Sequence, residues 1–285
     1  MTINSIGPTR RIALGVLAAC VSLAATAAMV AQASASPDLS VAQIVEKNAA
    51  ARGGLEAWRK IQTMVWVGHV ESANAPARFL LAMKRPNKTR FEITALNQMA
   101  VRVFDGSHGW KLHPTQGGKP NLQPYSLEEV KFAHDEQVID GPLMDYEAKG
   151  IAVTLDGVDE VEGHKAYRLG IRLPSGGRRH LWIDATTFLE RKYDRESRNV
   201  LGQLHTVTVF YRDYRAIDGL QIPCTIESGV ATAQATDKLV IDEVSFNPSL
   251  GDWLFAKPGT PRQDKPVSID AQARPGSGDV VRPAP

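Results

Sequence analysis

The fold is decided by the stretch 180–227, which contains HLWIDATTFLERKYD at 180–194, VTVFYRDYR at 207–215 and GLQIPCTIE at 219–227. In each segment apolar residues alternate with polar ones, as Leu181 and Ile183 do with His180 and Asp184. Alternation with a period of two is typical of a β-strand that buries one face. Asp184 and the later Asp-Gly pair supply the turns between strands. The stretch therefore predicts an antiparallel meander of strands with one buried, apolar face.

More strands are predicted on both sides of this meander. The alternation and turn residues place them at 64–72, 78–84, 88–95, 99–105, 110–112, 151–155, 160–162, 166–173 and 238–247. Asp156-Gly157 and Glu162-Gly163 are expected to be reversals, and 114–124 a loop rich in Gly and Pro. About ten or eleven short strands with turn signals between them indicate a barrel or a sandwich.

Three helical segments accompany the strands. Ser40 and Gln43 fit a capping box, and the apolar residues that follow have helical spacing as far as Gly53. A second short helix is expected over 55–61. A third should begin at Ser126 and run to about His134, within a central insertion that could cover the sheet.

The N-terminal segment 1–35 has the form of a secretory signal peptide. Arg10 and Arg11 precede an apolar run over 12–30, and an A-x-A site ends at Ala35. Two alternatives stay open: a retained membrane anchor, and a lipidated N-terminus at Cys20. The mature domain is expected over 36–258, in the periplasm. Residues 259–285, rich in proline and poor in bulky apolar side chains, are expected to be disordered.

Composition excludes several classes of protein. The chain has 33 Lys and Arg against 31 Asp and Glu, and loss of 1–35 would remove two arginines and leave the charges balanced. Balanced charge gives no reason to expect nucleic acid as a partner. Cys224 would be the one remaining cysteine, so an internal disulfide is excluded and Cys224 is expected to be buried.

The sequence shows no catalytic constellation. It has neither an H-E-x-x-H motif nor a G-x-S-x-G elbow, so no enzyme, metal site or cofactor is predicted. A metal-dependent hydrolase that uses His108, His113 or His134 remains an alternative.

The apolar positions on the strands predict a continuous apolar surface on one face of the sheet, called here the wall. It could pack a core, or it could line a cavity where an acyl chain gains about 0.8 kcal/mol per buried methylene. Periodicity does not separate these two interpretations.

Several phrases resemble those of periplasmic lipoprotein-sorting and carrier proteins of the LolA/LolB-like superfamily, especially the outer membrane lipoprotein-sorting proteins. They are AAARGGLEAWRKIQT at 49–63, KRPNKTRFE at 84–92, FDGSHGW at 104–110, LWIDATTFLERK at 181–192, FYRDYRAIDGLQIP at 210–223, and Phe246-Asn247-Pro248 with Phe255 and Pro258 beyond it. The resemblance implies a mainly β fold with some α: a curved, unclosed antiparallel barrel with an N-terminal helix and a helical lid. It also implies that an arginine on an early strand holds the lid, and Arg78, Arg90 and Arg102 are the candidates.

On the basis of this resemblance, the apolar face of the sheet is expected to bind lipid. The candidate cavity residues are Trp66, Phe79, Leu81, Met83, Phe91, Ile93, Val101, Val103, Leu169, Ile171, Leu181, Ile183, Val207 and Val209. The candidate lid residues are Leu127, Val130, Leu143 and Met144.

The resulting hypothesis is a monomeric, non-enzymatic periplasmic carrier of lipoprotein acyl chains or other lipid, acting in transport during outer membrane biogenesis. Transfer partners at the inner or outer membrane would follow from such a role. A periplasmic envelope-stress sensor or interaction module of the same fold is the main alternative.

Overall fold

The computed structural model describes residues 39–71, 77–115, 119–136, 139–198, 204–230 and 237–259. The predicted signal segment 1–35 and the predicted tail beyond residue 259 lie outside these ranges.

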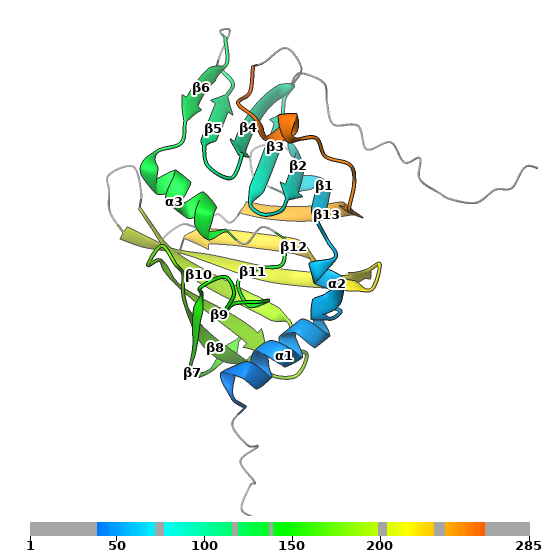
Figure 1. Ribbon diagram of the computed structural model, residues 1–285, viewed down its shortest axis with the longest axis vertical. Coiled ribbons are helices and arrows are strands. Elements are labelled where there is room, and N and C mark those ends of the chain that lie inside the picture. The colour runs from blue at the N-terminus through cyan, green and yellow to red at the C-terminus, as the bar shows by residue number, and fades with distance from the viewer. Residues whose placement is uncertain are drawn as a thin grey trace, which may run out of the picture. The chain divides into compact units, whose positions relative to one another are not determined.

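The described residues form one antiparallel sheet with a few helices (Figure 1). Its strand order is β6-β5-β4-β3-β2-β1-β13-β12-β11-β10-β9-β8-β7, so β6 and β7 are its edges and the sheet does not close. The strands are β1 (Thr63–Glu71), β2 (Ala77–Lys84), β3 (Lys88–Ala95), β4 (Gln98–Phe104), β5 (Gly109–His113), β6 (Asn121–Pro124), β7 (Ala152–Val161), β8 (His164–Arg172), β9 (Arg178–Asp184), β10 (Glu190–Arg198), β11 (Leu204–Ile217), β12 (Leu220–Val230) and β13 (Asp237–Phe246). The helices are α1 (Val41–Ala51), α2 (Leu55–Arg59), α3 (Leu127–Asp135) and the 3-10 helix η1 (Asp252–Phe255).

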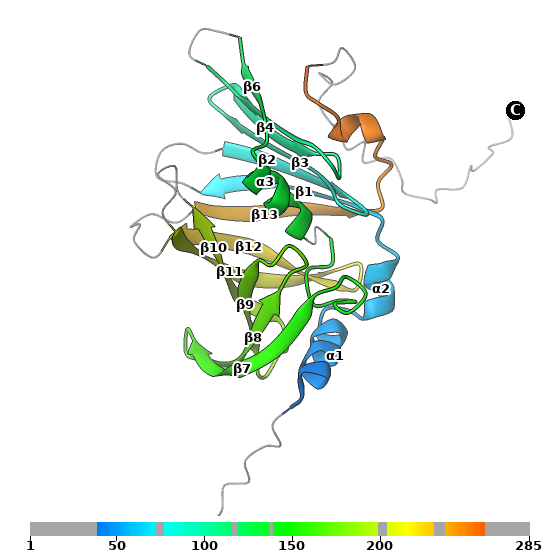
Figure 2. The same cartoon turned by 60° about the vertical axis from the view of Figure 1, so that its left-hand side comes forward.

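Consecutive strands are neighbours in the sheet except β6 and β7, which lie at its opposite edges, and β1 pairs with β13. This pairing brings the first and last strands together at the centre, with Trp66 opposite Val244 and Met64 opposite Phe246. A bulge shifts the register between Val67 and Gly68, and bulges of this kind increase the local bend of a strand. Figures 1 and 2 show the sheet curving, with α3 over its concave side.

The turns follow the predicted local chemistry. Asp184 accepts hydrogen bonds of 2.8 Å from the amides of both Thr186 and Thr187, and its other oxygen accepts from Arg191 Nε at 2.6 Å. Burial disfavours the ionised carboxyl, but these amides and the guanidinium lower the pKa of Asp184 to about 2. The reversal between β9 and β10 is thus built from residues 184–187, as predicted.

Helices α1 and α2 pack at one end of the sheet. Ser40 forms the predicted capping box with Gln43, and Ile44 of α1 is fully buried in a cluster with Leu143 and Leu169. On α2, Trp58 is buried and its Nε1 donates to the Arg52 carbonyl at 2.9 Å.

The last described segment covers the outer face of β1–β4. Leu254 and Phe255 of η1 are buried there against Val65, Ala82 and Val103. The strands here are covered unevenly, since most residues of β3 are only half-buried.

Three local predictions need correction. The predicted strands 151–155 and 160–162 are one strand, β7, and Asp156-Gly157 forms a bulge instead of a reversal, with the register shifting between Leu155 and Gly157. Asp-Gly suits a bulge as well as a turn, because glycine adopts the required positive φ, here 146°. Within the predicted loop 114–124, residues 121–124 add the edge strand β6, where a terminal proline is tolerated. The sheet therefore has thirteen strands among the described residues, more than the expected ten or eleven.

Within the described ranges, no helix has both the length and the apolar character needed to cross a membrane.

Candidate functional site

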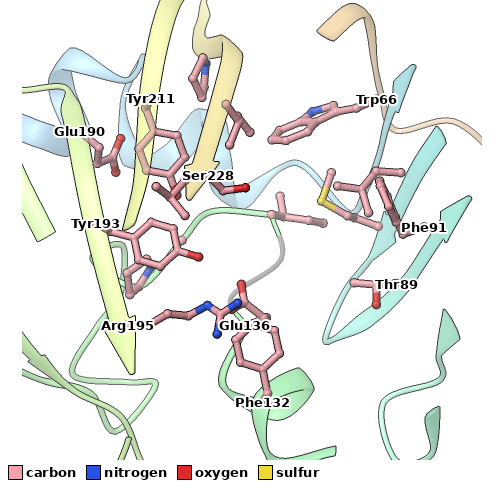
Figure 3. Close-up of a pocket in the computed structure, with 18 of the residues that line it drawn as sticks. Trp66, Thr89, Phe91, Phe132, Glu136, Glu190, Tyr193, Arg195, Tyr211 and Ser228 are labelled. Carbon is pink, nitrogen blue, oxygen red and sulfur yellow. The ribbon is translucent and has the colours of Figure 1, made fainter. Parts of the chain in front are cut away.

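A cavity of about 520 Å³ lies between the concave face of the sheet and α3 (Figure 3). A volume of this size falls within the range of pockets that bury small organic ligands. The side chains that line it come from both halves of the sheet, from α3 and from the segment after α3. The lining residues are Arg52, Trp58, Trp66, Leu81, Met83, Thr89, Phe91, Arg102, Tyr125, Glu129, Phe132, Ala133, Glu136, Ile139, Gly141, Pro142, Leu181, Glu190, Tyr193, Arg195, Val207, Val209, Tyr211, Tyr214, Ile222, Pro223, Ile226 and Ser228.

One wall of the cavity is apolar and comes from β1–β3. Trp66 stands directly opposite Leu81, and Leu81 stands opposite Phe91. Directly opposed residues of antiparallel strands project from the same face, so the three side chains form one continuous surface. Figure 3 shows Trp66 and Phe91 on the same side of the cavity.

The central strands β11 and β12 provide its floor. Tyr211 is opposite Ile226, and Val209 is opposite Ser228, so all four project from one face. At the other end of β12, Pro223 lies outside the segment Thr225–Ser228 that pairs with β13. A proline is tolerated there because its missing N–H removes no hydrogen bond to β13.

Helix α3 lies over the cavity with one face. Glu129, Phe132, Ala133 and Glu136 recur at spacings of three and four residues, which places them on the same side of a helix. Asn87 holds the end of the helix by donating from Nδ2 to the Ala133 carbonyl at 2.9 Å.

Glu129 anchors the beginning of α3 to the sheet. Its carboxylate accepts the Ser126 amide at 2.9 Å, which completes a capping box. It also accepts from Arg102 Nη2 of β4 at 3.0 Å and from Lys111 Nζ of β5 at 2.9 Å. Burial disfavours its ionised form, but the Ser126 amide, Lys111 and Arg102 together lower the pKa of Glu129 to about 2. The helix is therefore tied to β4 and β5 by an ionised carboxylate.

The three arginines considered as lid holders have different positions. Arg102 binds α3 through Glu129 and lies over the Tyr125 ring at 5.0 Å. Arg90 is buried on the outer face, where it donates from Nη1 to the Leu254 carbonyl at 3.1 Å. Arg78 is exposed. Of the three, Arg102 has the geometry that the resemblance implies.

A buried polar network closes the end of the cavity near α1. Arg52 Nη1 and Glu190 Oε1 are 3.1 Å apart, and the Tyr214 hydroxyl donates to the Glu190 carbonyl oxygen at 2.9 Å. The Arg52 guanidinium also lies over the Trp58 ring at 4.4 Å. Burial raises the pKa of Tyr214 and of Tyr211 well above the usual value, so both phenols stay protonated.

Half of the predicted cavity residues line this cavity. They are Trp66, Leu81, Met83, Phe91, Leu181, Val207 and Val209. Phe79 and Ile93 do not line it, although they belong to an adjoining cluster that includes Trp66, Leu81 and Phe91.

The other five predicted residues lie elsewhere. Val101 and Val103 stand opposite Glu92 and Arg90, because the β3–β4 register pairs Phe91 with Arg102. The two valines therefore face outward, and alternation within β4 did not reveal which set of side chains faces in. The remaining predicted residues are buried in the cluster that contains Ile44 of α1: Leu169, Ile171 and Ile183.

The predicted lid residues also separate into two groups. Leu127 is 90% exposed, and with Val130 it borders a separate surface pocket instead of the cavity. Leu143 and Met144 are fully buried in the core, because the segment after α3 returns to the sheet beside α1 and α2. The side chains of this insertion that reach the cavity from α3 are those on the Phe132 face.

The polar and aromatic side of the cavity was not predicted from the sequence. Tyr193, Arg195, Tyr211 and Phe132 all line it. The period of two was present in ERKYDRES at 190–197, where Tyr193 and Arg195 alternate with charged residues. Because both sets of residues in that strand are polar or amphipathic, the pattern did not mark an inner face.

Among the described residues no three His, Cys, Asp or Glu side chains are grouped so that they could hold a metal ion. Cys224 is buried, as predicted.

Comparison with known proteins relates this architecture to a known fold. No protein-family model and no curated protein sequence matches the chain. A solved structure of a LolA superfamily protein from Nitrosomonas europaea matches with a TM-score of 0.51 at 17% identity, over 77% of this chain and 98% of that one. The chain has a LolA-like fold. The predicted class, a mainly antiparallel and unclosed curved sheet with few helices, is thereby confirmed.

Two other solved structures also match this LolA-like chain. A DUF1329 family protein from Desulfovibrio piger has a TM-score of 0.48 at 12% identity, over 74% of this chain and 97% of that one. A domain named for outer membrane lipoprotein sorting, from Vibrio parahaemolyticus, has a TM-score of 0.48 at 11% identity, over 75% and 95% of the two chains. At such identities the likeness concerns the fold alone.

Proposed function

We propose that this protein is a non-enzymatic periplasmic carrier of lipid, with lipoprotein acyl chains as one class of cargo. The observation that carries the proposal is the cavity beneath α3, whose wall of Trp66, Leu81 and Phe91 is apolar. The LolA-like fold and the export signal predicted in 1–35 support a role in lipoprotein sorting between membranes.

Acyl chains suit this wall because it offers apolar area without a strict geometry. Each methylene that leaves water gains about 0.8 kcal/mol, so eight buried methylenes would contribute about 6 kcal/mol before the cost of ordering the chain. The aromatic residues of the cavity add area that does not depend on the length or branching of the chain. A carrier needs such tolerance if its cargo varies.

The position of α3 supports a carrier in which cargo enters beneath a helix. Its ion pairs with β4 and β5 are all made by one carboxylate, that of Glu129. Polar contacts of this kind exchange with water more readily than a packed apolar core. We therefore expect α3 to separate from the sheet at a lower free-energy cost than the strands separate from one another.

Binding of a fluorescent acyl probe tests the proposal. The variant Ser228→Trp places a bulky ring on the cavity floor and should weaken probe binding at least about tenfold. Its control, Ser107→Trp, puts the same ring on an exposed turn and should bind the probe as the wild type does. Mass spectrometry of lipids that remain bound to protein from its native periplasm identifies the cargo. The proposal would be refuted if the wild type bound no probe and no lipid copurified with it.

A further inference from the structure

Arg195 is a cation that faces the cavity without a carboxylate of its own. It projects from β10 on the same face as Tyr193, and Figure 3 shows its guanidinium reaching toward α3. Its Nε atom is buried and has no hydrogen-bond acceptor, and no described carboxylate forms an ion pair with it. A buried donor without an acceptor is costly, so such a group in a cavity indicates a missing partner.

The carboxylates that line the cavity are already engaged by other cations. Glu190 lies 3.1 Å from Arg52, and Glu129 lies 3.0 Å from Arg102 and 2.9 Å from Lys111. The third is Glu136, whose buried Oε1 forms an ion pair with Nη2 of Arg179, on β9, at 3.1 Å, although it accepts no hydrogen bond. At this end of the cavity two guanidinium groups, those of Arg179 and Arg195, therefore face one carboxylate. One of these two positive charges therefore has no anionic partner among the carboxylates that line the cavity.

The Phe132 ring of α3 packs against the Arg195 guanidinium. The guanidinium lies over this ring at 4.4 Å, and Arg179 lies over the same ring at 5.6 Å. Burial raises the pKa of the neighbouring Tyr193, so that hydroxyl keeps its proton and is available as a second donor. An arginine stacked on a ring presents its remaining N–H groups in a restricted direction, which suits the oxygens of a carboxylate or a phosphate.

Arg195 lies apart from the apolar wall formed by Trp66, Leu81 and Phe91. In Figure 3, Arg195, Tyr193 and Phe132 lie on one side, whereas Trp66 and Phe91 lie on the other. A ligand that satisfies both parts needs a charged head and a hydrocarbon tail.

We propose that the cavity binds an amphiphile with an anionic head, a carboxylate or a phosphate, whose oxygens meet Arg195 while its tail lies along Trp66, Leu81 and Phe91. This inference rests on the proposed function and narrows its cargo from acyl chains in general to anionic lipids. A neutral acyl ester or alcohol would offer Arg195 an oxygen but no negative charge, so its positive charge would stay without an anionic partner.

Calorimetry with three ligands of equal chain length tests the inference. Palmitate and hexadecyl phosphate carry the two anionic heads, and hexadecanol carries a neutral one. The wild type should bind at least one anion about tenfold more tightly than the alcohol, and the preferred anion tells which head the site suits. Arg195→Gln should lose about tenfold in affinity for that anion and keep its affinity for hexadecanol.

Arg78→Gln is the matched control, because Arg78 is an exposed arginine on β2, away from the cavity. It should bind all three ligands as the wild type does. Equal affinity of the wild type for anions and alcohol would overturn the inference and leave the lipid-carrier proposal standing. So would an equal loss of all three ligands in Arg195→Gln, provided that its urea midpoint matches the wild type. Failure of the wild type to bind any of the three would overturn both proposals.

Discussion

Glu129→Gln tests how α3 is held over the cavity. In the wild type the ionised carboxylate binds Arg102, Lys111 and the Ser126 amide, and its pKa is lowered from 4.5 to about 2. A shift of this size corresponds to about 3 kcal/mol at 1.36 kcal/mol per pKa unit. The side chain is 24% exposed, and water screens part of each ion pair, so we expect a loss of about 1–2 kcal/mol at neutral pH.

The pH dependence gives the sign of the effect. Because the pKa of Glu129 is lower in the folded state, its ionised form stabilises that state above the unfolded pKa of about 4.5. This contribution is lost as the pH falls from there toward about 2. The difference in unfolding free energy between wild type and Glu129→Gln should therefore be full at about pH 6.5 and smaller at about pH 3.

Urea unfolding at both pH values measures this difference, and amide hydrogen exchange over 127–135 shows whether the loss is located in α3. Glu128→Gln is the control, because Glu128 is the exposed neighbour on the same helix and should change stability by less than about 0.5 kcal/mol. An equal effect of Glu129→Gln at the two pH values would refute the reasoning. So would faster exchange throughout the sheet with no preference for α3.

Three further predictions concern the rest of the fold. Phe255 of η1 is fully buried, so Phe255→Ala leaves a cavity and should lower the unfolding free energy by about 3–5 kcal/mol in urea titrations; a loss below about 1 kcal/mol would show that η1 is not an integral part of the core. Gly68→Ala places a methyl group against the Val240 carbonyl oxygen, so the bulge must shift and the thermal midpoint should fall; a midpoint unchanged from wild type would contradict this close approach. Phe132→Ala should weaken acyl-probe binding, whereas Leu127→Ala, on the exposed side of the same helix, should not; equal effects would contradict the orientation of α3.

Local features of the sequence predicted the elements well because their causes are local. The capping boxes at Ser40 and Ser126 begin α1 and α3, and the turn at Asp184 follows from amides two and three residues away. The helical insertion was expected, and α3 runs to Asp135, one residue beyond the predicted end. Such features need no information about distant strands.

The candidate site was predicted only in part, since a cavity depends on register between strands. Val103 and Phe91 both belong to well-formed alternating strands, but β3 pairs Phe91 with Arg102 and so sends Val103 outward. Pairing Phe91 with Val101 or Val103, one residue away, would have reversed this result, and alternation alone carries no information about such an offset.

The sequence by itself determined a one-sided antiparallel sheet, its helices and most of its turns. Tertiary structure decided which face is concave, that β13 closes against β1, and that the outer face of β1–β4 is filled by η1. It also decided that Arg195 and Phe132, far apart in the chain, meet across the cavity at 4.4 Å. The physical reason is that periodicity records how each segment divides its own apolar and polar residues, whereas a hollow arises only where the faces of several curved segments fail to fill the space between them.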